Sequence, residues 1–234
     1  MATHISTRRT QFQYFDELLK RPAWKRRTIL DFGGNVGGFL LGAGNEVDHN
    51  RYWCLDVTRN AIEIGRRHFP RAHFEHYDRY SSYFNPKGVR HLPVPELGVK
   101  FDVVLAFSVF THMHQKEMIE LIGQLHRMLA PRGVVAFTFC DPLYESSQAD
   151  SKPSPRWYVE VGGQLHVEPG DQLCQQERSC QEEESYCSYF TADYMKSLFP
   201  GATVHPPVSP ERQHCCILRR SERLVAGGGK DPWS

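Results

Sequence analysis

The stretch Thr28-Ile29-Leu30-Asp31-Phe32-Gly33-Gly34-Asn35-Val36-Gly37-Gly38-Phe39-Leu40 decides how this chain is built. A short apolar run contains an acid near its end, Asp31, and four glycines follow within six residues before apolar residues resume. This order predicts a strand, a tight turn and the start of a helix. Glycine is required where the backbone takes a positive φ or approaches a ligand closely. We therefore expect backbone N–H groups at the carboxyl end of a strand, where open α/β sheets bind polar ligands.

The glycine spacing distinguishes between the known glycine-rich motifs. No register fits the dinucleotide fingerprint G-x-G-x-x-G, and no Lys-Ser or Lys-Thr follows as in a phosphate-binding loop. The stretch resembles motif I of class I S-adenosylmethionine-dependent methyltransferases, acid-x-Gly-x-Gly-x-Gly: Asp31, Gly33 and Gly37 match, and Asn35 replaces the middle glycine. Asn tolerates left-handed backbone, so we expect the turn to survive. The resemblance implies that this turn, with Gly34, binds the cofactor.

Composition limits the classes of partner. The 234 residues suit one α/β domain, and 28 Lys+Arg against 27 Asp+Glu leave no basic surplus for nucleic acid. No apolar run is long enough for a membrane span, and Met1–Arg9 lacks the apolar core of a signal peptide. We expect a cytoplasmic protein whose seven cysteines are reduced. The spacings of Cys174, Cys180 and Cys187 do not match C-x-x-C, so no metal is predicted.

Two further acids follow predicted strands. Arg51–Asp56 reads as the second strand, and Asp56 lies about twenty residues beyond the glycine turn, where a carboxylate can accept both hydroxyls of a ribose. The resemblance implies this role for Asp56, with Val57 beside it; a helix cap or a surface carboxylate is the alternative. Ala72–Tyr77 reads as the third strand. Asp78 follows it, and the resemblance implies a contact with the adenine amino group, with a plain turn carboxylate as the alternative.

Residues 79–100 form a long irregular stretch that contains Tyr80, Tyr83, Phe84 and Asn85. Long ordered loops in compact domains tend to be functional. The stretch leaves the carboxyl edge of the predicted sheet. We therefore expect it to border the adenine or the substrate.

The second motif is Phe101–His112. Its apolar run predicts a buried parallel strand, and its continuation Ser-Val-Phe-Thr-His resembles motif IV of small-molecule methyltransferases. The resemblance implies that Phe107 and Ser108 line the cofactor and that Phe110 and His112 lie near the substrate. His112 is a candidate catalytic residue, with a helix-cap histidine as the alternative.

The third motif follows directly. Apolar residues recur at three and four over a helix around Lys116–Leu129. Ala130-Pro131-Arg132-Gly133 is expected to end that helix, and Val134–Phe139 to form the fifth strand. The same family typically has a helix, then Leu-x-Pro-x-Gly, then an apolar strand. Three motifs in the right order are more specific evidence than any one of them.

The segment Asp141–Tyr189 departs from the common core, and we interpret it as a substrate-binding insertion after the fifth strand. Alternation on both sides of Gly162-Gly163 predicts a β-hairpin over Trp157–Val167. A cap on the sheet or a dimer contact is the alternative for this hairpin. The candidate substrate-binding aromatics of the insertion are Trp157, Tyr158, Tyr186 and Tyr189. The candidate bases of the whole chain are His112, His166 and Asp141.

The chain then closes with a short helix, Ala192–Phe199, and two strands, Ala202–His205 and His214–Arg219. The resemblance implies one Rossmann-like α/β domain over residues 1–220. Its sheet is expected to have seven strands, mostly parallel, with an antiparallel edge. Residues 221–234 are expected to form a flexible tail.

The resemblance implies that S-adenosylmethionine donates a methyl group to O, N or C of a small molecule, such as an intermediate of specialised metabolism, and leaves as S-adenosylhomocysteine. Two alternatives remain open. An enzyme of the same fold can instead release methylthioadenosine after cyclisation or aminocarboxypropyl transfer. A non-catalytic module can also retain the cofactor pocket.

Overall fold

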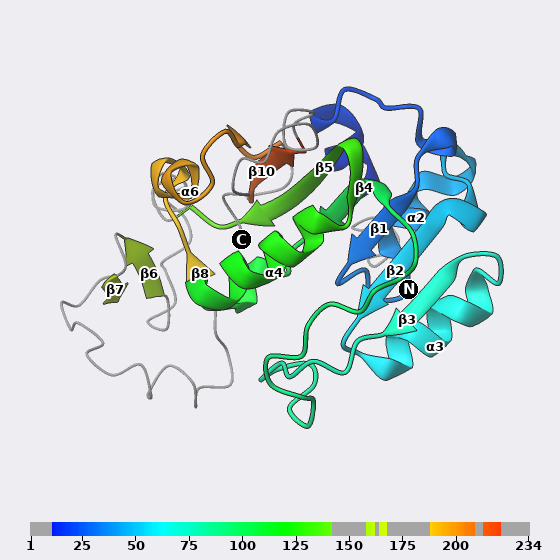
Figure 1. Cartoon of the computed structure of the whole chain (residues 1–234), viewed down its shortest axis with the longest axis horizontal. Coiled ribbons are helices and arrows are strands. Elements are labelled where there is room, and N and C mark those ends of the chain that lie inside the picture. Colours follow the sequence, from blue (N-terminus) through cyan, green and yellow to red (C-terminus); the bar gives the residue numbers. More distant parts are fainter. Residues whose placement is uncertain (1–10, 142–157, 162–163, 168–187, 209–212, 221–234) are drawn as a thin grey trace.

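The core of the protein is a seven-stranded sheet with the order β3-β2-β1-β4-β5-β10-β9 (Figure 1). The computed structural model describes residues 11–141, 158–161, 164–167, 188–208 and 213–220. The strands of this sheet are β1 Ile29–Phe32, β2 Tyr52–Asp56, β3 His73–His76, β4 Phe101–Ala106, β5 Leu129–Phe139, β9 Thr203–His205 and β10 His214–Arg219.

The first five strands are parallel to one another. Strand β10 runs antiparallel to both of its neighbours, β5 and β9. The expected mostly parallel sheet with an antiparallel pair at one edge is confirmed, and the antiparallel strand itself lies second from that edge. The strand order reverses between β1 and β4, because the chain first builds outward through β2 and β3 and then returns to the other side of β1.

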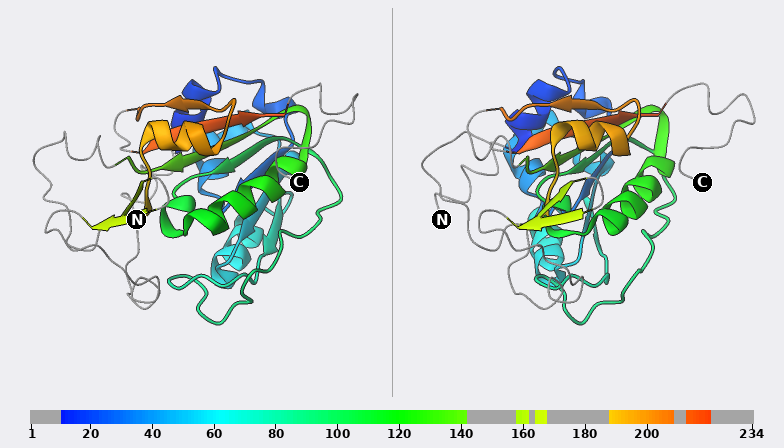
Figure 2. Two further views of the ribbon diagram at one scale, coloured as in Figure 1. Left: turned by 60° about the vertical axis from the view of Figure 1, so that its left-hand side comes forward. Right: turned by 90° about the vertical axis from the view of Figure 1, so that its left-hand side faces the viewer.

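Helices cover both faces of the sheet (Figure 2). The central strands are therefore buried on both sides, which explains their continuous apolar runs. Residues 11–18 are helical, and one face also carries α2 and α3, while α4 and α6 pack on the other. The helices with their bounds are α2 Gly38–Ala43, α3 Arg59–His68, α4 Gln115–Arg127 and α6 Ala192–Leu198. None of the helices in the described ranges has the length and apolarity that crossing a bilayer requires.

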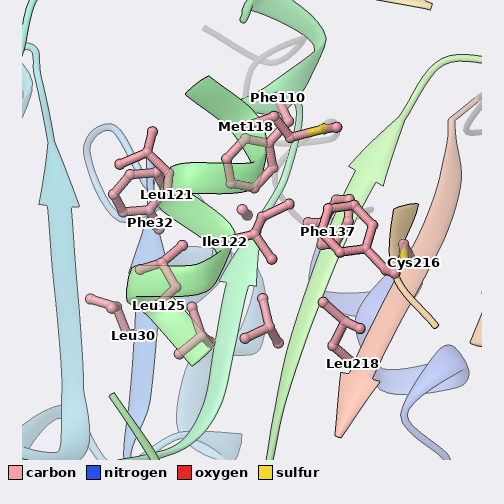
Figure 3. Close-up of a cluster of buried hydrophobic side chains, with 14 of the residues drawn as sticks. Leu30, Phe32, Phe110, Met118, Leu121, Ile122, Leu125, Phe137, Cys216 and Leu218 are labelled. Atoms are coloured by element: carbon pink, nitrogen blue, oxygen red, sulfur yellow. The ribbon is translucent and has the colours of Figure 1, made fainter. Parts of the chain in front are cut away.

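Helix α4 shows how the sequence pattern becomes packing. Its residues Met118, Leu121, Ile122 and Leu125 are fully buried, as their three-and-four spacing predicts. Figure 3 shows them facing aromatic and aliphatic side chains of the sheet and of the turn after β4. This layer fixes the amino-terminal end of α4 beside the carboxyl edge of the sheet.

One expected boundary was wrong. Residues 130–133 were expected to form a turn between helix and strand, but they belong to β5. Leu129 already pairs with Phe101, and the register then shifts before Val134 pairs with Val103. Arg132 takes a φ of 64° within this irregularity. A β-bulge therefore absorbs the Pro-Arg-Gly sequence inside the strand pairing.

The predicted hairpin is confirmed. Strand β6 Tyr158–Val161 pairs antiparallel with β7 Gln164–Val167, and Val161 stands opposite Gln164. Strand β8 Ser188–Tyr189 joins β6 in parallel, and a bridge from Tyr189 to Cys140 connects this small sheet to the end of β5. The remainder of the expected insertion, the three cysteines of its polar part and the expected tail lie outside the described residues.

Candidate functional site

The candidate site lies where β1, β2 and β4 end, beside the point at which the strand order reverses. Open α/β sheets bind ligands at such a switch point. The turns after β1 and β4 are in direct contact there: a Cβ on Gly33 would lie 2.4 Å from a methyl carbon of Val109. A side chain at position 33 would therefore require the Val109 side chain to move.

The glycine turn has left-handed backbone at three places. Gly33, Asn35 and Gly37 have φ values of 74°, 54° and 85°. The expectation that Asn35 replaces glycine without loss of the turn is confirmed by its conformation. Gly37 faces the core rather than open space, because a Cβ there would lie 2.9 Å from the ring of Phe74.

Asp56 organises this turn. Its Oδ2 accepts a hydrogen bond from the Asn35 N–H at 2.8 Å, and its Oδ1 accepts one from the Thr58 N–H at 2.7 Å. A carboxylate has about four acceptor positions. The two bonds to the backbone therefore use half of its capacity, and acceptor positions remain for ligand hydroxyls. Hydrogen bonding to the local backbone and a contact with a ribose therefore do not exclude each other at Asp56.

Asp31 is the second carboxyl group of the site and is 5% exposed. The Tyr52 hydroxyl donates to its Oδ2 at 2.5 Å. Burial raises the pKa of Asp31 to about 7; the Tyr52 hydrogen bond opposes this shift, and the negative charge of Asp56 adds to it. A Cβ on Gly34 would lie 2.6 Å from the Asp31 carboxyl carbon. The backbone of the turn therefore lies directly against this acid.

A hydrogen-bond network holds the turn after β4. Ser108 has a φ of 57°, and its N–H donates to the Thr138 hydroxyl at 2.7 Å. Gln213 donates through Nε2 to the Ser108 hydroxyl at 3.0 Å and accepts from the Thr138 hydroxyl at 2.5 Å. The Tyr14 hydroxyl in turn donates to the Gln213 carbonyl at 2.9 Å. Strain in such a turn is common at functional sites.

The helix over residues 11–18 packs against this same turn. The ring of Phe107 meets those of Tyr14 and Phe15 edge to face, with centroids 5.8 and 6.1 Å apart. Sequence reasoning missed Tyr14 and Gln213 because each lies far along the chain from Ser108. No local pattern marks either residue.

The predicted adenine contact, Asp78, is exposed just beyond β3. Its Oδ1 accepts a hydrogen bond from the Asn85 amide at 3.0 Å. Val57 is half-buried beside the end of β2, and its carbonyl lies 3.1 Å from Nε2 of His76. Asp78 therefore helps to hold the following loop, which agrees with the alternative that it is a turn carboxylate. Its side chain is also exposed to solvent.

His112 ends the short 3-10 helix Phe110–His112 and is exposed. Its ring lies edge to face with that of Phe84, with centroids 6.0 Å apart. The loop after β3 and the turn after β4 are thus in contact at the carboxyl edge. This contact also places residues 79–100 beside the candidate site, as the loop length suggested.

The remaining predicted residues are placed differently. Phe110 is fully buried between Phe32 and Phe137, so its expected role in substrate binding does not fit its position (Figure 3). Tyr189 is also buried and does not offer its ring to a substrate. Asp141 is buried as well. Its Oδ2 accepts the Ala192 N–H at 2.8 Å and fixes the start of α6.

Two of the predicted site residues lie on the strands of the hairpin. Tyr158 lies on β6 and His166 on β7, opposite Val167 and Val159 respectively. Trp157 and Tyr186 lie outside the described residues. Of the three candidate bases, only His112 presents a described, exposed side chain at the carboxyl edge of the main sheet.

Comparisons with known proteins agree with this architecture. Residues 30–135 match a family model described as a methyltransferase domain. Among solved structures, the chain resembles S-adenosylmethionine-bound CalS10, an amino pentose methyltransferase from Micromonospora echinaspora. The TM-score is 0.59 at 15% identity, over 94% of this chain and 97% of that one.

Two further structures show the same fold. Magnesium protoporphyrin IX methyltransferase from Synechocystis, with bound S-adenosylhomocysteine, matches with a TM-score of 0.54 at 11% identity, over 93% of this chain and 83% of that one. An S-adenosylmethionine-dependent methyltransferase from Mesorhizobium loti matches with 0.55 at 15% identity, over 88% and 98%. Residues 30–135 thus match a methyltransferase domain, and the chain has the Rossmann-like fold of the S-adenosylmethionine-dependent methyltransferases named above.

Proposed function

We propose that the protein methylates a small molecule and that its cofactor lies across the ends of β1, β2 and β4. The observation that carries this proposal is the carboxylate of Asp56, which holds the Asn35 N–H of the left-handed turn and retains acceptor positions. Those positions suit the two hydroxyls of a ribose. Asp31, beside Gly34, places a second carboxyl group against the same turn.

The remaining cofactor contacts follow from the neighbouring turns. Gly33, Gly34, Asn35 and Gly37 shape the turn after β1, and Ser108 shapes the turn after β4. Phe107 supplies an apolar surface below the helix over residues 11–18. We assign Val57 and Asp78 to the adenine side, because they follow β2 and β3.

When bound, S-adenosylmethionine supplies a methyl group on a good sulfonium leaving group. The protein's own contribution is then to align the acceptor and to exclude water, which supplies about 7–11 kcal/mol in favourable intramolecular cases. His112 is the proposed base that takes the proton of the acceptor, because it is exposed at the carboxyl edge beside the turn after β4. Tyr158 and His166, which lie on the hairpin strands, stay proposed contacts of the acceptor.

The acceptor is proposed to be small. The chain has a net charge of +1, which leaves no surplus for a phosphate-rich polymer. The sugar methyltransferase and the porphyrin methyltransferase named above share this fold. Their different substrates show that the fold alone does not choose the acceptor.

Product analysis tests the proposal. The protein is incubated with methyl-deuterated S-adenosylmethionine and a cell extract, and small products are analysed by mass spectrometry. We expect a metabolite that gains the labelled methyl group together with S-adenosylhomocysteine. Release of methylthioadenosine instead would assign the chain to cyclisation or aminocarboxypropyl transfer. Cofactor binding without either product would favour a non-catalytic module.

A further inference from the structure

The loop after β3 is built rigidly from within. We call residues 78–92 the aromatic loop. The Asn85 amide donates to the Asp78 carboxylate at 3.0 Å and to the Arg79 carbonyl at 3.1 Å. Ser81 and Asn85 exchange two backbone hydrogen bonds, and the Val89 N–H donates to the Asp78 carbonyl at 2.7 Å. The loop therefore closes on itself around one amide side chain.

A buried arginine then fixes this loop to α4. Arg79 is 2% exposed, and its Nε donates to the Glu117 carboxylate at 3.0 Å. Its Nη1 donates to the Leu92 carbonyl at 2.6 Å, and Glu120 lies 3.5 Å from the same nitrogen. A buried charge that is fully paired is costly to displace. Both ends of the aromatic loop are thereby held in one position against the helix.

This rigid loop nevertheless exposes two aromatic rings. Tyr83 is 67% and Phe84 48% exposed, and their rings stand edge to face with centroids 4.8 Å apart. Phe84 also contacts the ring of His112. A single exposed apolar residue needs no explanation, whereas a contiguous exposed group often marks a binding site. Rings held in place before binding lose little entropy when a ligand arrives.

Building on the proposed function, we propose that Tyr83, Phe84 and His112 form an aromatic wall that selects acceptors carrying a flat ring. The wall continues from the loop into the turn that carries the proposed base, so a ring stacked on it would lie beside His112. Tyr83 and Phe84 present a phenol ring and a phenyl ring. Selection would therefore rest on the shape and the π-face of the acceptor rather than on its charge.

The test uses pairs of neutral probes that differ only in the ring. Benzyl alcohol is compared with cyclohexylmethanol, and 2-naphthylmethanol with its decahydro analogue, by NMR titration of the full chain in saturating S-adenosylhomocysteine. We expect the flat member of each pair to bind about three- to tenfold more tightly. The double variant Tyr83→Ser, Phe84→Ser should lose this preference while its affinity for S-adenosylhomocysteine stays within about twofold.

Three further variants distinguish the loss of an aromatic ring from a disturbed conformation of the aromatic loop. Val89→Ala removes an exposed apolar side chain from the same loop, since Val89 is 51% exposed, and should keep the preference. Phe84→Tyr should keep it as well, whereas Phe84→Leu should reduce it with no change in melting temperature. Equal binding of flat and saturated probes by the wild type would overturn the proposal.

Two other results would also overturn the proposal. One is loss of self-association in the double variant, seen by ultracentrifugation, which would assign the rings to a contact between copies of the chain. The other is loss of binding to vesicles of phosphatidylcholine and phosphatidylglycerol, which would assign them to a lipid surface. Failure of the wild type to bind S-adenosylhomocysteine would instead overturn the proposed function itself.

Discussion

At the scale of single residues, the two acids of the site perform different work. Asp56 accepts backbone hydrogen bonds with both oxygens and so fixes the turn. Asp31 is more deeply buried, accepts the Tyr52 hydroxyl and lies close to a second acid, so its ionisation is unfavourable near neutral pH. The same sequence feature, an acid closing a parallel strand, thus produces one hydrogen-bonded and one desolvated carboxyl group.

The pKa of Asp31 predicts a pH-dependent effect on stability. Burial raises this pKa from 3.8 to about 7 in the folded protein. The contribution of Asp31 to stability is therefore fully present below about pH 4 and is lost as pH rises through 7. Asn cannot ionise, so Asp31→Asn should gain about 2–3 kcal/mol relative to wild type between pH 5 and pH 8. Urea unfolding at both pH values measures this difference.

An exposed aspartate serves as a control for the pH effect predicted at Asp31. Asp193 is exposed and lies on the short helix α6, away from the turn. Asp193→Asn should show no comparable change between pH 5 and pH 8. If Asp31→Asn followed the same pH profile as wild type, the carboxyl group of Asp31 would be ionised in the folded state and the desolvation argument would be incorrect.

At the scale of elements, the turns after β1 and β4 form one unit. Gly33 lets Val109 approach, while Gln213 donates to the Ser108 hydroxyl and accepts from the Tyr14 hydroxyl at its carbonyl. The helix over residues 11–18 is coupled to this unit through the Tyr14 hydroxyl. The geometry of the candidate site therefore depends on segments from both ends of the described chain.

The left-handed positions of the first turn predict a graded response to substitution. Asn35→Gly should keep the turn and bind S-adenosylhomocysteine within about twofold of wild type, because glycine adopts a positive φ freely. Asn35→Ala should destabilise the protein by about 1–2 kcal/mol, since alanine in this region is strained. Gly37→Val should be worse, because a side chain there also meets the Phe74 ring.

Thermal unfolding and calorimetry with S-adenosylhomocysteine rank these three variants. At Gly37 the expected damage comes from contact with the core, because the added side chain meets the Phe74 ring. A Gly37→Val protein with wild-type stability and affinity would show that the turn does not need its left-handed conformation.

Local patterns account for most of the fold and for part of the site. The left-handed Asn35, the buried stripe of α4 and the β6–β7 hairpin each follow from a few neighbouring residues. Contacts between residues from distant segments cannot be predicted from such local patterns. The contact of Gln213 with Ser108 joins positions 105 apart in the chain.

The incorrect expectations have the same origin. Phe110 belongs to a motif that resembles a substrate-lining turn, but packing against Phe32 and Phe137 buries its ring. The Pro-Arg-Gly sequence after α4 has the composition of a turn, but pairing of Leu129 with Phe101 draws it into β5. In both cases a tertiary contact overrides the local preference.

At the scale of the whole molecule, two segments flank the carboxyl edge of the sheet. The aromatic loop follows β3, and the β6–β7 hairpin is joined through β8 to the end of β5 (Figure 1). Strand β8 is also held independently of the hairpin, because the Ser188 hydroxyl donates to the Met113 carbonyl at 2.5 Å. The attachment of β8 to the main domain therefore does not require the hairpin.

This independence gives a prediction for the hairpin. Replacing Trp157–Val167 by a short Gly-Ser linker should leave affinity for S-adenosylhomocysteine within about threefold of wild type and should abolish turnover of the acceptor found by product analysis. Calorimetry and product mass spectrometry measure the two properties on the same preparation. Unchanged turnover would remove the hairpin from the acceptor site, and loss of both properties would make it part of the core.

The central claim is that Asp56 connects the glycine turn to the cofactor, and calorimetry with S-adenosylhomocysteine tests it most directly. Hydrogen bonds to a charged group contribute about 1.5–3 kcal/mol each, so Asp56→Ala should weaken binding at least about tenfold. Asp193→Ala, which removes an exposed carboxylate, should bind like wild type. Circular dichroism confirms that both variants are folded. A folded Asp56→Ala protein with wild-type affinity would contradict the account.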